Sequence, residues 1–430
     1  MSASHSSDVA VVGAGLAGLA CAARLAEAGM DVQVLEASDD VGGRARTDRV
    51  DGFLLDRGFQ ELNTAYPEVK RVLDLEALSL CSFSRAMLLH VEGAVIRLAD
   101  PRREPLAALA AARAPIGSLR DKAALGAYAG AVGYLPVSRL LHQSERTASD
   151  NWRRYGMSPR VIDRVLRPFF AGLLLETEMT TSGRFADLMM RMFIRGESTI
   201  PAAGMQAMSA QLAARLPTGS LQLETPVSHV RTGAVQAPTG RVAARAVVVA
   251  TDAEVAAQLL PGSAAPMWKG VTTVYHAAPE SPLDEPILIV DAERSPINNT
   301  VVVTEAAPSY SSDGRALIAT SLVHGPGVDP ASVDDERLRR HLARLYRTST
   351  SRWVRIASYD VPRALPSMRA PHDFRKPVRV TGVDGAYVCG DHRDTSSIQG
   401  ALVSGRRAAD AVLADLGVTR SGLSGSSSNG

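Results

Sequence analysis

Cysteine is scarce in this chain, and the few cysteines are far apart. The 430 residues include three of them, Cys21, Cys81 and Cys389, with no CxxC pair and no spacing typical of a zinc site. A disulfide framework needs more cysteines, and structural zinc needs closely spaced ligands. We therefore expect no metal and no disulfide framework, and the reducing cytoplasm is the simplest location for such a chain.

Long apolar runs and a strong net charge are also missing. No stretch reaches the roughly eighteen uninterrupted apolar residues of a transmembrane helix, and the polar start "MSASHSSD" does not resemble a secretory signal. The 47 basic and 45 acidic side chains leave a formal net charge of +2. This balance argues against a nucleic-acid-binding stripe and against a polybasic membrane anchor.

The remaining composition is that of an ordinary globular protein, 46% hydrophobic and 21% charged. A chain of this length exceeds what one core usually supports, so we expect two domains. The N-terminal part predicts a βαβ unit, with apolar runs at 9–12 and 32–35 around a helix over 16–28. Gly29 is placed to end that helix, and the parallel strands need a right-handed crossover.

A glycine-rich turn, "GAGLAG", joins the first strand to the helix and fits the pattern GxGxxG. Gly13 permits the tight turn, Gly15 lets the backbone approach a pyrophosphate, and Gly18 lets the helix pack against the strand. Leu16 and Ala17 begin the helix, whose N-terminal N–H groups favour phosphate. These residues predict a dinucleotide site in this turn.

An acidic residue follows the second strand of the unit. Glu36, with Ala37 after it, lies where a carboxylate can accept hydrogen bonds from ribose hydroxyls. The next motif, "VGGRART", brings Gly42 and Gly43, which allow close approach of a ligand, and Arg44, which can pair with a phosphate. A solvated loop with a surface arginine is the alternative interpretation of that motif. The glycine turn and Glu36 alone do not distinguish NAD from FAD.

The rest of the chain alternates between helical and β-rich segments. Residues 101–175 predict helices interrupted at Pro115, Pro136, Pro159 and Pro168, and such a block suggests an inserted domain. Residues 205–215 predict an amphipathic helix. Residues 268–360 predict an antiparallel sheet with a covering helix over 334–347, and a last helix is expected over 397–416. The Gly/Ser-rich tail 419–430 is expected to be a flexible end.

Seven segments together resemble one family, the FAD-dependent amine oxidase superfamily of flavin-containing amine oxidoreductases. They are the glycine turn with Glu36, "GGRART", "GFLLDRGFQELNTAYPEV" from Gly52, "PAAGMQAMSAQLAARLP" from Pro201, "LETPVSHV" from Leu223, "VVVATDA" from Val247, and "YVCGDHRDTSSIQGALVSGRRAA" from Tyr387. They span residues 8 to about 416 in the family's order. The sequence is more similar to the protoporphyrinogen oxidase and phytoene desaturase side than to the true amine oxidases.

The resemblance implies a set of FAD-binding residues. Gly42, Gly43 and Arg44 would hold the pyrophosphate, and Val227 would meet the adenine through its backbone. The others would lie along the ribityl chain and flavin ring: Arg57, Gly58, Phe59, Gln60, Gly390, Asp391, Gln399, Gly400 and Ala401. The start of the last helix would stabilise negative charge on the reduced ring, and Gly400 would leave room for the ring.

Some residues depart from the amine oxidases in that family. The residues after Asp391 include no cysteine that could carry a covalent flavin, and Cys389 is expected to be buried packing, so we predict non-covalent FAD. Paired aromatics that would cage an amine are not evident, with Tyr359 and Tyr387 the nearest candidates. His392 and Asp394 could form an acid–base pair, but a polar turn near the phosphates is the favoured interpretation. No catalytic residue is assigned.

The expected fold is α/β, a doubly wound Rossmann-like FAD-binding domain interleaved with an α+β substrate domain. Residues 1–80, 200–262 and 376–418 would form the first domain, and 81–199 and 263–375 the second. We expect an FAD-dependent oxidoreductase that takes hydride from a C–H bond of a largely apolar small molecule, with oxygen or another acceptor. The alternatives are a redox-neutral flavin-dependent isomerase, an amine oxidase and a non-catalytic FAD-binding protein. The apolar segments 167–175 and 187–193 favour packed core over a substrate tunnel.

Overall fold

The computed structural model describes residues 6–99, 104, 106, 113–260, 262, 264–293, 295–325 and 333–418. The predicted flexible tail 419–430 lies outside the described residues. The chain divides into two compact units. Unit 1 contains Met1–Gly43, Met208–Pro266 and Phe374–Gly430, and unit 2 contains Arg44–Ala207 and Met267–Asp373. Each unit therefore collects segments that are far apart in the sequence.

Unit 1 is built on a seven-stranded sheet with a parallel centre. Its strands are β1 (Ser6–Val12), β2 (Val32–Leu35), β10 (Leu221–Gln222), β11 (His229–Arg231), β12 (Ala234–Ala237), β13 (Gly240–Val249) and β19 (Ala386–Val388). The order is β10-β2-β1-β13-β12-β11, with β19 also paired to β13. Only the β11–β12–β13 part is antiparallel. The C-terminal halves of the central strands β1 and β13, Val9–Val12 and Ala246–Val249, are apolar and buried because both of their faces are covered.

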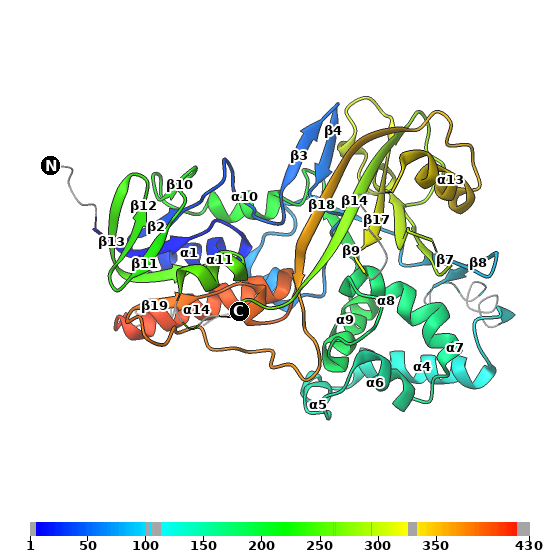
Figure 1. The fold of residues 1–430 in the computed structure, drawn as a ribbon, viewed down its shortest axis with the longest axis horizontal. Coiled ribbons are helices and arrows are strands. Elements are labelled where there is room, and N and C mark those ends of the chain that lie inside the picture. The colour runs from blue at the N-terminus through cyan, green and yellow to red at the C-terminus, as the bar shows by residue number, and fades with distance from the viewer. Residues whose placement is uncertain are drawn as a thin grey trace, which may run out of the picture. The chain divides into compact units, whose positions relative to one another are not determined.

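Three helices cover this sheet. They are α1 (Leu16–Glu27), α11 (Ala253–Leu259) and α14 (Ile398–Asp415). Alternate strand residues such as Ala10, Val12 and Val249 share an apolar cluster with Ala256 and Leu259 of α11. The helices α1 and α14 pack against each other and contact β1, β2 and β19 (Figure 1). The short turn η4 (Asp391–Arg393) connects β19 towards α14. The Rossmann-like fold predicted from the sequence is confirmed.

Unit 2 contains a second seven-stranded sheet. Its strands are β7 (Met87–Val91), β8 (Ala94–Leu98), β14 (Trp268–Ala278), β15 (Leu288–Asp291), β16 (Asn299–Val302), β17 (Ala316–Val323) and β18 (Val354–Pro366). The order is β18-β14-β17-β16-β15-β7-β8, and β15–β7 is the parallel pair. The helix α13 (Asp335–Tyr346) buries Leu338, Leu342 and Leu345 in a cluster with strand residues of this sheet. The expected antiparallel sheet with a covering helix is therefore present.

A block of helices completes unit 2. Its members are α4 (Leu119–Tyr134), α5 (Val137–Leu141), α6 (Ala148–Arg154), α7 (Pro159–Val161), α8 (Arg167–Leu174) and α9 (Gly183–Arg195). A capping box of Ser118 and Asp121 starts α4. The helical chain does not stop at Pro168. Instead, α7 runs through a π-helical turn, η1 (Ile162–Leu166), into α8, because a π-bulge can relieve the clash that a proline makes in a regular helix.

Short strands and helices in unit 2 place residues 44–80 in this unit. They are β3 (Thr47–Val50), β4 (Phe53–Asp56), β5 (Leu62–Asn63), α2 (Pro67–Val72), β6 (Leu80–Ser82), β9 (Ser198–Pro201), α12 (Val303–Ala306) and η2 (Pro308–Tyr310). The strands β5 and β6 both pair with β9. Residues 44–80 therefore belong to unit 2, whereas the sequence analysis groups them with the FAD-binding segments.

The helix α10 (Ala207–Ala213) starts at the border between the two units and is shorter than the predicted helix over 205–215. The described helices include none that combines the length and the apolar character needed to cross a bilayer.

Candidate functional site

The glycine turn of unit 1 leaves open space at one position only. A Cβ on Gly18 would lie 2.0 Å from the carbonyl oxygen of Gly13, and a Cβ on Gly13 would lie 3.0 Å from that of Ala250. Gly13 also has a φ of +104°, which favours glycine. In contrast, a Cβ on Gly15 would meet no heavy atom within 4 Å. Gly13 and Gly18 thus serve the packing of the turn, while Gly15 faces space that a ligand can enter.

The start of α1 suits an anion. The N-cap residue is Gly15, which offers no side-chain oxygen, and the first turn of α1 contains no acidic residue. The first N–H groups of a helix have no partner within the helix, and the helix dipole adds positive potential at this end. Together with the open space at Gly15, these features give the backbone here the geometry and positive potential that suit a phosphate.

A second glycine pair lies against this turn. The N–H of Gly42 donates to the carbonyl of Ala14 at 3.0 Å, and a Cβ on Gly43 would lie 3.5 Å from the Cα of Gly15. Both glycines have positive φ, +121° and +58°. The structure therefore brings Gly42 and Gly43 to the glycine turn.

Glu36 is buried and fixed by backbone donors. Its Oε2 accepts from the N–H of Ala14 at 2.6 Å, and its Oε1 accepts from the N–H of Ser38 at 2.9 Å. Each carboxylate oxygen has a second lone pair, so these bonds still leave the group able to accept from a ribose. The sequence predicted the position of this carboxylate but not its bond to the glycine turn.

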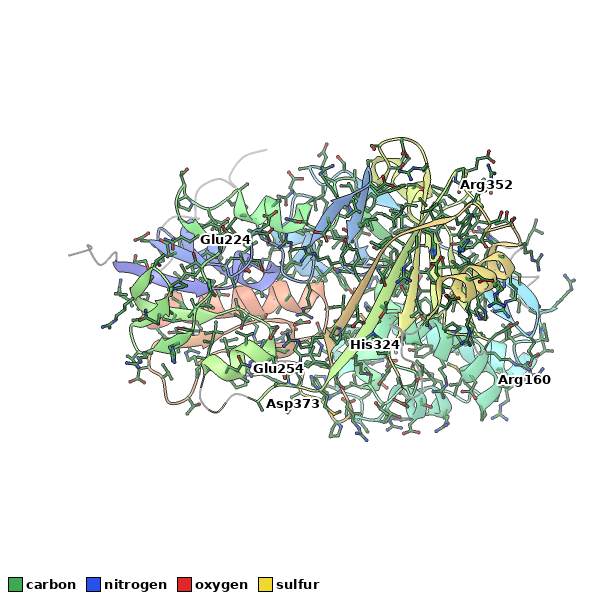
Figure 2. The ribbon with its side chains drawn as sticks, turned by 45° about the horizontal axis from the view of Figure 1, so that its top comes forward. Arg160, Glu224, Glu254, His324, Arg352 and Asp373 are labelled. Carbon is green, nitrogen blue, oxygen red and sulfur yellow. The ribbon has the colours of Figure 1, made fainter. Side chains whose placement is uncertain are left out.

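The segment that contains Val227 runs beside Glu36. The N–H of Thr225 donates to the carbonyl of Glu36 at 2.7 Å, and the N–H of Glu224 donates to that of Ser38 at 2.9 Å. Glu224 follows β10 at the edge of the sheet (Figure 2). Val227 packs against the apolar cluster of unit 1. Ala37 and Val227 are thus in one neighbourhood, although 190 positions of sequence numbering separate them.

The C-terminal turn of unit 1 also contains a glycine with positive φ. Gly390 has a φ of +144°, and a Cβ there would lie 2.5 Å from the ring of His392. Its N–H donates to Ser404 Oγ of α14 at 2.9 Å. Asp391 follows in η4 and is buried. The turn is therefore tied to α14 by a bond that no local sequence pattern indicated.

The start of α14 is capped by Ser397, whose Oγ accepts from the N–H of Gly400 at 3.1 Å. A Cβ on Gly400 would lie 1.8 Å from the carbonyl oxygen of Thr395. Glycine at this position is therefore explained by the chain's own backbone, whereas the sequence analysis explained it by the approach of the flavin ring. Gln399 and Ala401 flank Gly400 in the first turn of this helix.

Asp394 has a structural partner. Its Oδ2 accepts from the guanidinium of Arg407 at 3.2 Å. Burial raises the pKa of Asp394, against the hydrogen bond from the N–H of Thr395 and the charge of Arg407. Arg407 also donates to the carbonyls of Arg393 and Lys376. These contacts support the interpretation of this segment as a fixed polar turn.

The remaining residues implied by the resemblance lie in unit 2. Arg44 donates to the carbonyl of Ala364 at 2.7 Å, and its guanidinium lies 5.7 Å from the centre of the Trp268 ring. Gln60 donates to the carbonyl of Arg44 at 2.8 Å. These contacts connect the segment after "GG" to β14 and β18.

Arg57 forms a bidentate ion pair with Asp48, with both N–O distances 2.9 Å. Tyr359 donates to the same carboxylate at 2.9 Å, and the hydrogen bond from Arg57 holds the pKa of Asp48 below its ordinary value. Gly58 has a φ of +98°, and the N–H of Phe59 donates to Thr273 Oγ1 at 3.1 Å. The hydroxyl of Tyr359 is thus hydrogen-bonded to the carboxylate of the Arg57–Asp48 ion pair. The other aromatic candidate, Tyr387 of unit 1, donates to Asp415 at 2.7 Å.

Two sites of buried charge in unit 2, an ion pair and a single carboxyl group, escaped the sequence analysis. Lys269 of β14 pairs with Glu176 and donates to Thr181 Oγ1 at 2.9 Å. Burial lowers the pKa of Lys269, against the charge of Glu176. Burial alone would raise the pKa of Glu176, but Lys269 and Thr181 hold it below its ordinary value. A lysine in the apolar strand sequence "MWKGVTTVYHAA" was the available signal.

The second group is Asp187, which starts the segment 187–193 and is 1% exposed. Its Oδ1 accepts from Tyr128 Oη and Asn151 Nδ2, each at 2.9 Å. Burial raises its pKa to about 7. Trp152 and Phe170, both fully buried in the helical block, have ring centres 4.9 Å apart and ring planes tilted by 47°. In the segments 167–175 and 187–193 the predicted core is therefore present on one face only, because Phe169, Leu173 and Met190 are half-buried.

Comparisons with known proteins place these features in a family. A family model described as flavin containing amine oxidoreductase matches residues 16–413. Putrescine oxidase from Kocuria rosea is 30% identical over 242 residues, 52% of this chain and 49% of the relative. Carotenoid 3,4-desaturase from Haloarcula japonica is 53% identical over 51 residues, 12% of this chain and 10% of the relative. The chain thus matches half or less of the length of these curated relatives.

The solved structures share the fold over almost the whole chain. An oxidoreductase from Methanosarcina mazei superposes with a TM-score of 0.74 at 17% identity, covering 94% of this chain and 100% of that one. At such identity the likeness concerns the fold alone.

Proposed function

We propose, since the chain belongs to the flavin-containing amine oxidoreductase family, that it takes hydride from a C–H bond of a largely apolar small molecule with bound FAD. FAD-dependent oxidoreduction in the broad sense follows from the family; the substrate class is the finer proposal. The observation that carries the FAD-binding part of the proposal is the glycine turn of unit 1, where Gly15 faces open space at a helix start without a side-chain cap, beside Gly43 and Glu36. When bound, FAD would supply the redox chemistry itself.

The residues of unit 1 fit that cofactor. The N–H groups at the start of α1 would hold the pyrophosphate, with Gly15 and Gly43 leaving the backbone accessible. Glu36 would accept from the ribose, since its carboxylate is already oriented by two backbone donors. The turn at Gly390 and Asp391 would bind the ribityl part, and the start of α14 would stabilise negative charge on the reduced ring. Arg44, Arg57, Gly58, Phe59 and Gln60 are proposed to contribute from unit 2.

The cofactor is proposed to be non-covalent. Cys389 is fully buried, and burial raises the pKa of its thiol to about 12, so a thiolate able to attack a flavin is strongly disfavoured. The three free cysteines also support a cytoplasmic location.

Two substrate classes have support from the relatives. An apolar substrate is favoured by the similarity to a carotenoid desaturase and by the scarcity of aromatic candidates for an amine cage. The candidates Tyr359 and Tyr387 both use their hydroxyls in bonds to carboxylates. Amine oxidation is the second candidate, because the putrescine oxidase match covers far more of the chain.

Anaerobic reduction of the bound flavin tests the proposal and separates the candidates. The purified protein, loaded with FAD, is mixed without air with a carotenoid polyene in detergent micelles, or with putrescine. Bleaching of the visible flavin band by the polyene supports the apolar class, and bleaching by putrescine alone supports amine oxidation. Product of unchanged mass with no acceptor consumed would identify an isomerase. A flavin that neither compound reduces, while dithionite does, contradicts both substrate classes.

A further inference from the structure

The helix α14 makes two close contacts through adjacent residues in its buried face. Ser404 is fully buried, and its Oγ accepts from the N–H of Gly390 at 2.9 Å and donates to the carbonyl of Ala401 at 2.9 Å. One hydroxyl thus joins the C-terminal turn to the second turn of α14. The Gly390 N–H has no other partner among the described residues, so its hydrogen bond depends on this serine.

The next residue fixes α14 against α1. A Cβ on Gly405 would lie 2.2 Å from the carbonyl oxygen of Ala17 and 3.1 Å from its carbon. Glycine therefore allows the two helix backbones to approach at the first turn of α1. Further along, Arg24 of α1 donates to Asp410 of α14 at 2.7 Å. The helix α14 is held on α1 at two levels (Figure 1).

We infer that Ser404 and Gly405 are positioning residues that set the distance between the glycine turn 13–18 and the turn at 390–391. Gly405 determines where α14 sits on the first turn of α1, and Ser404 determines where the turn at Gly390 sits on α14. Both contacts lie within unit 1. The inference rests on the proposed function, which assigns these two turns to different parts of one FAD molecule.

Removing the Ser404 hydroxyl should weaken FAD binding more than it weakens the fold. In the cofactor-free Ser404→Ala variant, the turn after β19 can shift to give the Gly390 N–H to water. Binding of FAD would require the turn to close again, with a buried N–H left without a partner. Such a group typically costs about 1–3 kcal/mol, which corresponds to a roughly 5- to 150-fold rise in the dissociation constant.

Ser209→Ala is the matched control. Ser209 is also a fully buried helical serine, and its Oγ has no partner among the described residues. Its loss removes an unpaired hydroxyl, so FAD affinity should stay within about twofold. Leu25→Ala is a second control, because it opens a cavity under the far end of α1 and lowers stability without touching either turn.

The experiment measures the FAD dissociation constant of each cofactor-free protein by quenching of flavin fluorescence, together with its thermal midpoint. Ser404→Ala should lose at least about fivefold in affinity, and its bound flavin should show altered visible fine structure, while Leu25→Ala lowers the midpoint with a smaller change in affinity. Equal affinity of Ser404→Ala and the wild type overturns the inference, as does an equal loss in Leu25→Ala. A wild-type protein that binds no FAD would instead overturn the proposed function.

Discussion

The buried carboxyl group of Asp187 should make unit 2 less stable as the pH rises from about 4 to about 7. Its carboxyl is 1% exposed, and its Oδ2 has no hydrogen-bond partner among the described residues. Burial raises the pKa from the ordinary value of 3.8 to about 7, against the hydrogen bonds from Tyr128 and Asn151. The folded chain therefore binds a proton that the unfolded chain has already released between about pH 4 and pH 7.

The sign of the effect follows from this proton. Stability falls as the pH rises through that window, and above about pH 7 the loss is complete, because the folded carboxyl is then ionised while buried. Each pKa unit corresponds to about 1.4 kcal/mol, so the whole loss is roughly 4 kcal/mol. Between pH 5 and pH 8 the free energy of unfolding of the wild type should therefore fall by roughly 2–3 kcal/mol.

Asp187→Asn removes this titration while keeping an oxygen for Tyr128 and Asn151. The free energy of unfolding is measured with urea at pH 5 and pH 8, with tryptophan fluorescence as the probe, since Trp152 donates to the Tyr128 hydroxyl. Relative to the wild type, the free energy of unfolding of Asp187→Asn should be roughly 2–3 kcal/mol larger at pH 8 than at pH 5. The control Asp163→Asn removes an exposed i,i+4 ion pair with Arg167. It should leave the pH dependence of the free energy of unfolding almost unchanged. The same pH dependence in the wild type and Asp187→Asn would refute the reasoning.

Two further predictions concern the glycine turn 13–18 and the buried ion pair of Lys269 and Glu176. The Gly15→Val variant should fold normally, because a Cβ at Gly15 meets no heavy atom within 4 Å. It should weaken FAD binding roughly ten- to hundredfold, because the side chain fills the space proposed for the phosphates. An FAD titration that matches the wild type would contradict this role of Gly15. Lys269→Met should cost roughly 3–5 kcal/mol of unfolding free energy, because it leaves Glu176 buried and unpaired. Adding Glu176→Gln should recover most of that loss in the same urea assay, and no recovery in the double variant would contradict the account of the pair.

Local patterns in the sequence were enough to find the βαβ unit and its glycine turn. The apolar runs and the stop at Gly29 each depend on residues a few positions apart, so a single segment contains the whole signal. The same holds for the covering helix, which begins at its N-cap Asp334. The family resemblance added the expectation that distant segments share one fold.

Interactions between distant segments could not be predicted in this way. Nothing near Gly390 indicates that Ser404 accepts its N–H, and nothing near Lys269 indicates Glu176, which lies 93 positions earlier. The resemblance implies that Gly400 leaves room for the flavin ring, whereas its close approach to the Thr395 carbonyl could not be predicted because it depends on the path of the turn before α14. The roles of the proposed FAD-binding residues remain predictions that ligand binding must test.

The visible absorption spectrum of the purified chain, before and after acid precipitation, tests the central claim most directly. The account predicts the two bands of oxidised flavin in an amount equimolar with the chain after loading with FAD and removal of the excess. It also predicts that acid releases the flavin into solution, because no thiolate holds it. A colourless protein that takes up no FAD would contradict the claim that this turn binds the cofactor, and a yellow precipitate would contradict non-covalent binding.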